Sequence, residues 1–282
     1  MMLKREDIEL ELFTSALKRR YGYDFSDYAA ASFKRRVLGL VAHYKLANLS
    51  QLTEKLLHDE AALPDMIAQL SVPVSEMFRD PEVFARLRNE VFPVLASYPV
   101  INIWQAGCAH GEEVYSLAIL LTEAGLYERT QIYATDISPR ALDAAREGIF
   151  PARELRAYAE NYLRAGGKHT LSDYFHARYG HLMLDESLRR NVVFATHNLA
   201  TDGPFCEAQL ILCRNVLIYF KPTLQHRVVD LFHQSLGRGG YLCLGTKESL
   251  RFTGNAEQFT LIDAASSLYR RGGKAAVHGC AG

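Results

Sequence analysis

The residues with the clearest chemical potential surround a glycine-bearing turn near the middle of the chain. The turn reads Ala106-Gly107-Cys108-Ala109-His110-Gly111 and is followed directly by Glu112 and Glu113. A dinucleotide fingerprint would read G-x-G-x-x-G and leave helix N–H groups free for pyrophosphate. Two carboxylates at a helix start stabilise the helix dipole but would repel phosphate, so they favour a ligand that carries an ammonium group. The same pattern also fits a plain strand–helix turn capped by acidic residues.

Polar residues follow three other segments that are typical of buried strands. Asp136 ends one segment, Asn198 follows another, and Arg214-Asn215 ends a third. In an open parallel sheet, ligands bind beside the carboxyl ends of the strands. An acid in the position of Asp136 commonly accepts hydrogen bonds from ribose hydroxyls, and it would equally suit a cap for the helix after Ser138. Arg214 also suits a structural ion pair. S-adenosylmethionine, which has no phosphate and carries an ammonium and a sulfonium, fits this set of groups.

The elements that position these residues alternate between strands and helices. The sequence predicts strands at 100–106, 131–136, 191–196, 209–213 and 241–245, and helices at 112–124, 138–148 and 223–236. Such alternation indicates a parallel sheet in an α/β fold. Near the end, residues 258–262 and 267–271 alternate like an antiparallel hairpin. The long polar stretch at about 150–190 predicts an inserted subdomain, because structureless connections of this length are uncommon within a domain.

The first part of the chain has a different pattern. Hydrophobic residues recur at helical spacing, as in Leu10, Phe13 and Leu17. We therefore expect a small all-helical domain over residues 1–75. Asp80-Pro81 is typical of an N-cap followed by proline at the first helical position, which predicts a linker helix within 76–97. A Rossmann-like domain would then cover 98–271, and 272–282 would form a flexible tail.

Composition and charge narrow the classes of function. The chain has 282 residues, with 32 lysines and arginines balancing 32 aspartates and glutamates. This zero net charge argues against a nucleic-acid partner. The five cysteines form no C-x-x-C pair, which is typical of reduced thiols, and no apolar run is long enough to span a membrane. We expect a cytoplasmic protein without membrane insertion. No H-E-x-x-H motif or Cys/His cluster with zinc spacing occurs, so we expect no metal.

The motifs taken together are more specific than any one of them. Their order is W-x-A-G-C-x-x-G-E-E-x-Y-S from Trp104, A-T-D-I from Ala134, H-N-L from His197 and C-R-N-V-L-I-Y-F from Cys213. This order closely resembles that of the CheR-type chemotaxis-receptor methyltransferases, over about residues 13–271. The resemblance implies a helical N-terminal domain and a Rossmann-like S-adenosylmethionine methyltransferase domain with a small inserted β-subdomain. It also implies methyl transfer to glutamate side chains of receptor cytoplasmic domains, with S-adenosylhomocysteine as product.

The resemblance also implies roles for individual residues. Glu113 would bind the amino group of the cofactor, Asp136 the ribose, and Asn198 with Leu199 would lie beside the adenine. Tyr219 would stand near the reacting methyl group. The cofactor-binding set implied is Ser75, Arg79, Ala106, Gly107, Glu113, Asp136, Ile137, Asn198, Leu199, Arg214 and Asn215.

One segment departs from the family pattern Thr-Asn-x-Thr-x-Phe-Phe-Arg-Asp. Here it reads Val72-Pro73-Val74-Ser75-Glu76-Met77-Phe78-Arg79-Asp80. The hydroxyl at Ser75 and the guanidinium at Arg79 are kept, whereas Pro73 replaces the asparagine and Met77 replaces a phenylalanine. Arg79 suits a carboxylate clamp, because its planar fork matches that shape, and it equally suits a structural ion pair. We treat Arg79 and Tyr219 as the candidate catalytic residues.

The partner is the least specified part of the interpretation. The family presents basic residues of an N-terminal helix to the receptor, and Lys34-Arg35-Arg36 is a short basic run that also suits a solvated face. The receptor could be a methyl-accepting chemoreceptor or a related signalling protein. Residues 175–181 show no insertion that would dock a receptor tail peptide, so we expect no tethering, and we expect a monomer. Transfer to another protein or a small carboxylic acid, and a cofactor-binding adaptor without activity, stay open as alternatives.

Overall fold

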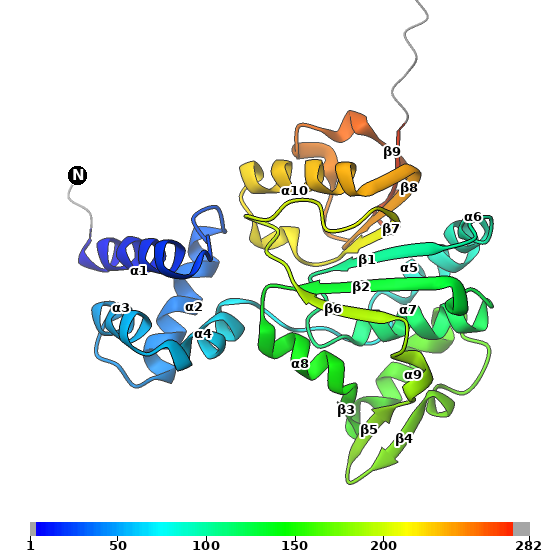
Figure 1. The fold of residues 1–282 in the computed structure, drawn as a ribbon, viewed down its shortest axis with the longest axis horizontal. Coiled ribbons are helices and arrows are strands. Elements are labelled where there is room, and N and C mark those ends of the chain that lie inside the picture. Colours follow the sequence, from blue (N-terminus) through cyan, green and yellow to red (C-terminus); the bar gives the residue numbers. More distant parts are fainter. Residues whose placement is uncertain (1–3, 273–282) are drawn as a thin grey trace, which may run out of the picture.

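A seven-stranded sheet forms the centre of the computed structural model, which describes residues 4–272 (Figure 1). The strands are β1 (Ile101–Ala106), β2 (Thr130–Asp136), β6 (Val192–Thr196), β7 (Ala208–Cys213), β8 (Leu236–Leu244), β9 (Phe259–Asp263) and β10 (Leu268–Arg271). Their spatial order is β6-β2-β1-β7-β8-β10-β9. The first five are parallel, and β10 pairs antiparallel with both β8 and β9. The predicted α/β fold is confirmed, and β1 lies where the strand order reverses.

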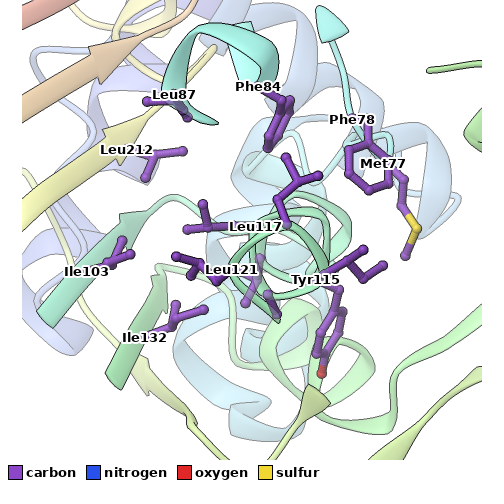
Figure 2. Close-up of a cluster of buried hydrophobic side chains, with 14 of the residues drawn as sticks. Met77, Phe78, Phe84, Leu87, Ile103, Tyr115, Leu117, Leu121, Ile132 and Leu212 are labelled. Carbon is purple, nitrogen blue, oxygen red and sulfur yellow. The ribbon is translucent and has the colours of Figure 1, made fainter. Parts of the chain in front are cut away.

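Hydrophobic clusters cover both faces of the sheet. Successive side chains of a strand point to opposite faces, so a strand such as β1 contributes to both clusters. On β1, Ile101 and Ile103 join one hydrophobic cluster, whereas Trp104 and Ala106 join another. The first cluster includes helix α7 (Glu112–Glu123) and the second includes helix α10 (Pro222–Ser235). Figure 2 shows the first cluster, in which Leu117 and Leu121 of α7 lie between the strands and Phe84. Met77 is completely buried in the same cluster, so it fills a core position.

The helices next to the central turn begin as their sequences predict. Helix α8 (Pro139–Glu147) has Ser138 as its N-cap, whose hydroxyl accepts a hydrogen bond from the backbone N–H of Ala141.

A helical run extends from Pro81 to Leu95 as α5 (Pro81–Arg86), a π-helical turn (Leu87–Val91) and α6 (Phe92–Leu95). Asp80 does not cap this run with its side chain, which corrects our expectation. Its backbone is left-handed, with φ 54°, and its carboxylate bonds elsewhere.

Four helices precede residue 71, and a small sheet follows α8. The helices are α1 (Arg5–Tyr21), α2 (Ala30–His43), α3 (Leu49–His58) and α4 (Leu63–Leu70). The small sheet has the order β3-β5-β4, formed by β3 (Ile149–Pro151), β4 (Phe175–Arg178) and β5 (His181–Leu184). The expected inserted β-subdomain is therefore present. It also contains helix α9 (Leu155–Arg164), which the sequence analysis does not predict. Its buried Tyr158 and Tyr162 are aromatic residues that favour helices weakly.

Backbone hydrogen bonds attach the helical part to the loop after β7. The N–H of Ala29 donates to the carbonyl of Tyr219 at 2.8 Å, and the N–H of Lys221 donates to Asp27 at 2.8 Å. Tyr28 and Phe220 form the bridge between these bonds, and their rings meet edge to face at 4.9 Å. The loop that carries Tyr219 is thus held from the helical side by main-chain groups.

Candidate active site

A cavity of about 310 Å³ lies at the carboxyl ends of the parallel strands. Its wall draws on the chain after β1, β2, β6 and β7, on residues 71–79, and on the helical part of the molecule. The lining includes Tyr28, Arg36, Pro73, Ser75, Arg79, Gly107, Ala109, Glu113, Asp136, Ile137, His197, Asn198, Leu199, Arg214, Asn215, Val216 and Tyr219. Every candidate residue from the sequence except Ala106 lines it. The structure therefore brings together groups that lie far apart in the chain.

Ala106 is the exception, and its exclusion follows from strand alternation. Its side chain is completely buried in the cluster that contains Trp104 and α10. The chain leaves the sheet only at the next residue, so Gly107 is the first that meets the cavity. A side chain at the end of a strand can face only one side of the sheet, and that of Ala106 faces the core.

The turn after β1 requires glycine at two positions. Gly107 has φ +74°, and a Cβ built there would lie 2.5 Å from Cγ2 of Val216. Gly111 has φ +90°, and its Cβ would lie 3.1 Å from both Tyr115 and Ala145. Positive φ and close approach both favour glycine over any other residue. The turn is therefore a tight strand–helix connection, and it also brings backbone to the cavity wall.

Glu113 stands at the start of α7 and is nearly buried. Its Oε1 accepts a hydrogen bond from Nε2 of Gln105 at 2.7 Å, and its Oε2 accepts one from Nη1 of Arg214 at 2.5 Å. Nη2 of Arg214 donates to Oδ2 of Asp80 at 2.6 Å. The interpretation of Arg214 as an ion-pair residue is therefore correct. Burial alone would disfavour its charge, but the carboxylates of Glu113 and Asp80 outweigh this and raise its pKa.

Asp136 combines the two roles that the sequence left open. Its Oδ1 accepts from the N–H of Ser138 and its Oδ2 from the N–H of Ala109, both at 2.9 Å. It therefore braces the turn after β1 as well as the start of α8. The carboxyl also lines the cavity, where each oxygen retains a second lone pair for a ligand hydroxyl. Burial raises the pKa of Asp136, and the two backbone hydrogen bonds oppose this rise.

The loop after β7 is held in an unusual conformation. Asn215 has φ 61°, in the left-handed region. Its N–H donates to Oε2 of Glu248 at 2.9 Å, and the N–H of Ile218 donates to Oε1 at 3.1 Å. The buried carboxylate of Glu248 thus fixes the start of the turn, while the N–H of Ala29 holds the backbone carbonyl of Tyr219. The position of the Tyr219 ring in the cavity wall is thus set by groups that sequence reasoning did not identify.

Tyr28 and Arg36 also line the cavity, although the sequence interpretation placed neither in the cofactor site and named Arg36 only within the basic run. In the basic run, Lys34 pairs with Glu6 and Asp7, and Arg35 is exposed. Only Arg36 of the three lines the cavity, with its guanidinium 5.2 Å from the centre of the Tyr219 ring. Helical spacing offered a signal, because Arg36 flanks the stripe of buried residues Phe33, Val37 and Leu40.

The residues present match the chemistry of S-adenosylmethionine. Carboxylates at Glu113 and Asp136 suit an ammonium group and a ribose diol, and Arg79 suits a carboxylate. Leu199 and Ile137 offer apolar surface for a purine. Within residues 4–272 there is no group of three or more His, Cys, Asp or Glu side chains arranged to hold a metal ion. No helix in the same range is long and apolar enough to cross a membrane.

An open, mostly parallel sheet with this cavity at its strand ends is a Rossmann-like arrangement, and the match to a SAM-binding methyltransferase domain defines its class as an S-adenosylmethionine-dependent methyltransferase. Comparison with known families makes the assignment narrower. Residues 8–71 match the family described as "CheR methyltransferase, all-alpha domain", and residues 73–267 match "CheR methyltransferase, SAM binding domain". The chain belongs to the CheR methyltransferases.

Relatives of similar length support this membership. The protein named Cher3 from Pseudomonas putida is 48% identical over 95% of this chain and 98% of its own. A chemotaxis protein methyltransferase from Listeria monocytogenes is 31% identical, over 84% of this chain and 88% of its own. One from Vibrio parahaemolyticus is also 31% identical, over 91% of this chain and 94% of its own.

Proposed function

We propose that this methyltransferase acts on glutamate side chains in the cytoplasmic domain of a methyl-accepting chemoreceptor or a related signalling protein, and forms glutamate methyl esters. The relatives named as chemotaxis protein methyltransferases support this choice of substrate. One structural observation carries it: the cavity presents two guanidinium groups, those of Arg36 and Arg79, that take part in no ion pair with any other described residue.

Two guanidinium groups without an ion-pair partner among residues 4–272 match the charges of the reacting pair, although Arg36 also donates to the backbone carbonyls of Ser32 and Leu70. The cofactor has one carboxylate of its own, and a glutamate acceptor brings a second. Arg214 also lines the cavity, but Glu113 and Asp80 already neutralise it. Nη2 of Arg36 is buried without a hydrogen-bond partner among the described residues. A buried, unpaired donor of this kind is costly unless a ligand satisfies it.

The remaining lining residues divide into regions around the cofactor. In the proposed arrangement Glu113 receives its ammonium group, Asp136 its ribose, and Asn198 with Leu199 its adenine. Gly107, Ile137, Ser75 and Asn215 complete the wall around it. Tyr219, with Arg36 over its ring, then faces the reacting centre. When bound, S-adenosylmethionine supplies an electrophilic methyl group on a sulfonium.

The chain needs to provide alignment more than proton transfer. A glutamate side chain has an unperturbed pKa of about 4.3, so it is already an anion at neutral pH. No general base is required, and burial raises the pKa of Tyr28 so far that its hydroxyl stays protonated there. In the proposed arrangement Arg36 and Arg79 hold carboxylates. Positioning of this kind can account for much of a rate enhancement.

Isotope transfer tests the proposal. The protein is incubated with cofactor labelled in the methyl group and with cytoplasmic domains of methyl-accepting chemoreceptors. Label should enter the receptor and be released by mild alkali as volatile methanol, because methyl esters hydrolyse and N-methyl groups do not. Alkali-stable label, or label confined to a small carboxylic acid, would contradict the proposal. Binding of cofactor without transfer to any receptor would favour an adaptor.

A matched pair of variants tests the role of the helical side. Arg36→Ala should lower kcat/KM for the receptor about a hundredfold, because a desolvated charged hydrogen bond contributes roughly 2–3 kcal/mol. Arg35→Ala removes the same charge from the neighbouring, exposed position and should change kcat/KM less than about twofold. If the two variants behave alike, the basic run acts only as a general electrostatic surface.

A further inference from the structure

The segment between α4 and α5, residues 71–80, crosses from the helical part to the sheet (cyan in Figure 1) and is held in a strained form. Two of its residues, Phe78 and Asp80, have left-handed backbones with φ 52° and 54°. Neither is glycine, and such conformations persist only where surrounding contacts enforce them. The buried Phe78 ring and a 2.8 Å hydrogen bond from its N–H to Oγ of Ser116 provide one such contact.

Asp80 provides the other contact, through Arg214. The side chain of Arg214 has an exposed fraction of 1%, and its guanidinium lies between the carboxylates of Glu113 and Asp80. It also stands over the ring of Phe84, 5.6 Å from the centroid. One buried cation thus faces two carboxylates, of which Glu113 is nearly buried and Asp80 is partly exposed. The group carries an excess of one negative charge, directed to the part of the cavity lined by Glu113.

We infer that Asp80 is a positioning residue for the amino-acid end of the cofactor, an inference that rests on the proposed contact between Glu113 and the cofactor's ammonium. Because Asp80 also pairs with Arg214, the positive charge of Arg214 is shared between two carboxylates. Glu113 is therefore only partly neutralised and still attracts an ammonium group. Through the backbone it also fixes its neighbour Arg79, which lines the same cavity. Asp80 therefore affects both the charge of Glu113, which meets the cofactor's ammonium, and the position of Arg79, which meets its carboxylate.

Replacing Asp80 would change both ends of this arrangement. Without its charge, Arg214 pairs with Glu113 alone and neutralises it. The constraint on the left-handed turn is released as well, so Arg79 is no longer aimed at the cavity. The adenine and ribose region, lined by Asp136 and Leu199, does not touch this network and should be unaffected.

Two ligands separate this role from a merely structural one. S-adenosylhomocysteine has the amino and carboxyl groups, whereas 5′-methylthioadenosine has the same nucleoside and lacks both. Asp80→Asn keeps the shape of the side chain, and asparagine tolerates the left-handed region. By calorimetric titration, D80N should bind S-adenosylhomocysteine about tenfold more weakly, as for one charged hydrogen bond. Its affinity for 5′-methylthioadenosine should change less than about twofold.

Glu82→Gln is the matched control, because it removes a carboxylate two positions away that pairs only with the exposed Arg164. It should bind both ligands as the wild type does. Should D80N not fold, Asp80→Gly is measured instead, since glycine relieves the left-handed backbone and also lacks the charge.

The outcomes are distinct. Equal weakening of both ligands, or no weakening of either, overturns the role of Asp80 and leaves the proposed function intact. If the wild-type protein binds S-adenosylhomocysteine no more tightly than 5′-methylthioadenosine, that result would instead contradict the proposed contacts of Glu113 and Arg79.

Discussion

Replacing Gly107 with alanine should destabilise the protein more than adding one methyl group at an exposed position, because Gly107 lies in the tight turn after β1. The added Cβ would lie 2.5 Å from Cγ2 of Val216, and the backbone φ is +74°. Left-handed backbone costs a residue with a Cβ about 1–2 kcal/mol, and an extra methyl in packed surroundings costs about 1–3 kcal/mol. We therefore expect G107A to lower the free energy of unfolding by about 3 kcal/mol.

Urea unfolding followed by circular dichroism measures this loss, and calorimetric titration with S-adenosylhomocysteine measures the effect on the cavity. Gly39→Ala is a matched control, because Gly39 lies within α2 with nothing within 4 Å of an added Cβ. It should stabilise the protein by about 0.5–1 kcal/mol, since alanine favours helices over glycine. In G107A, Val216→Ala should restore the packing part of the loss and leave the backbone part. A G107A variant within about 1 kcal/mol of wild type would refute the reasoning.

Three further predictions concern pH and partner choice. Burial raises the pKa of Glu248, so the fold favours its protonated form. The stability that this form contributes is complete below about pH 4 and is lost as the pH rises through the raised pKa. The free energy of unfolding of wild type relative to Glu248→Gln, from urea unfolding, should therefore fall as the pH rises above about 4, and a rise would show that the carboxylate is favoured in the fold. The kcat/KM for a receptor should vary less than about threefold between about pH 6.5 and 8.5, because the acceptor needs no deprotonation; a steep loss near pH 7 would reveal an essential base. The hairpin of β4 and β5 closes with only Tyr179-Gly180 between its strands, so methylation should not require a receptor tail peptide, and tight calorimetric binding of such a peptide would contradict this expectation.

The sheet side of the cavity could be predicted well from the sequence. Parallel strands end at one edge, so polar residues that follow separate strands must converge there whatever their distance along the chain. Asp136, Asn198 and Asn215 all line the cavity for this reason. Ala106, which only the family resemblance implied, does not line the cavity, because its side chain takes the opposite face of the sheet and packs in the core.

The helical side was harder to predict, for a physical reason. Nothing local specifies which face of α2 meets the loop after β7, since this depends on how separate parts of the chain dock. Helical spacing places Arg36 beside the buried stripe of α2, but it does not show that this stripe meets the cavity, and nothing in the sequence indicates this for Tyr28. Asp80 was assigned to a helix cap because its neighbours suit one, yet its carboxylate is 2.6 Å from an arginine that lies 134 positions away. Local patterns contain no information about such a partner.

The attachment of the helical part to the loop at Tyr219 has a consequence for how relatives can diverge. The bonds from Ala29 to Tyr219 and from Lys221 to Asp27 join main-chain atoms, so substitutions at these positions need not break them. The face that we propose receives the acceptor can therefore accumulate changes while the helical part keeps its alignment with the loop after β7. Substitutions of side chains on this face can therefore change which partner binds, while the main-chain bonds keep Tyr219 in the same position relative to the cavity.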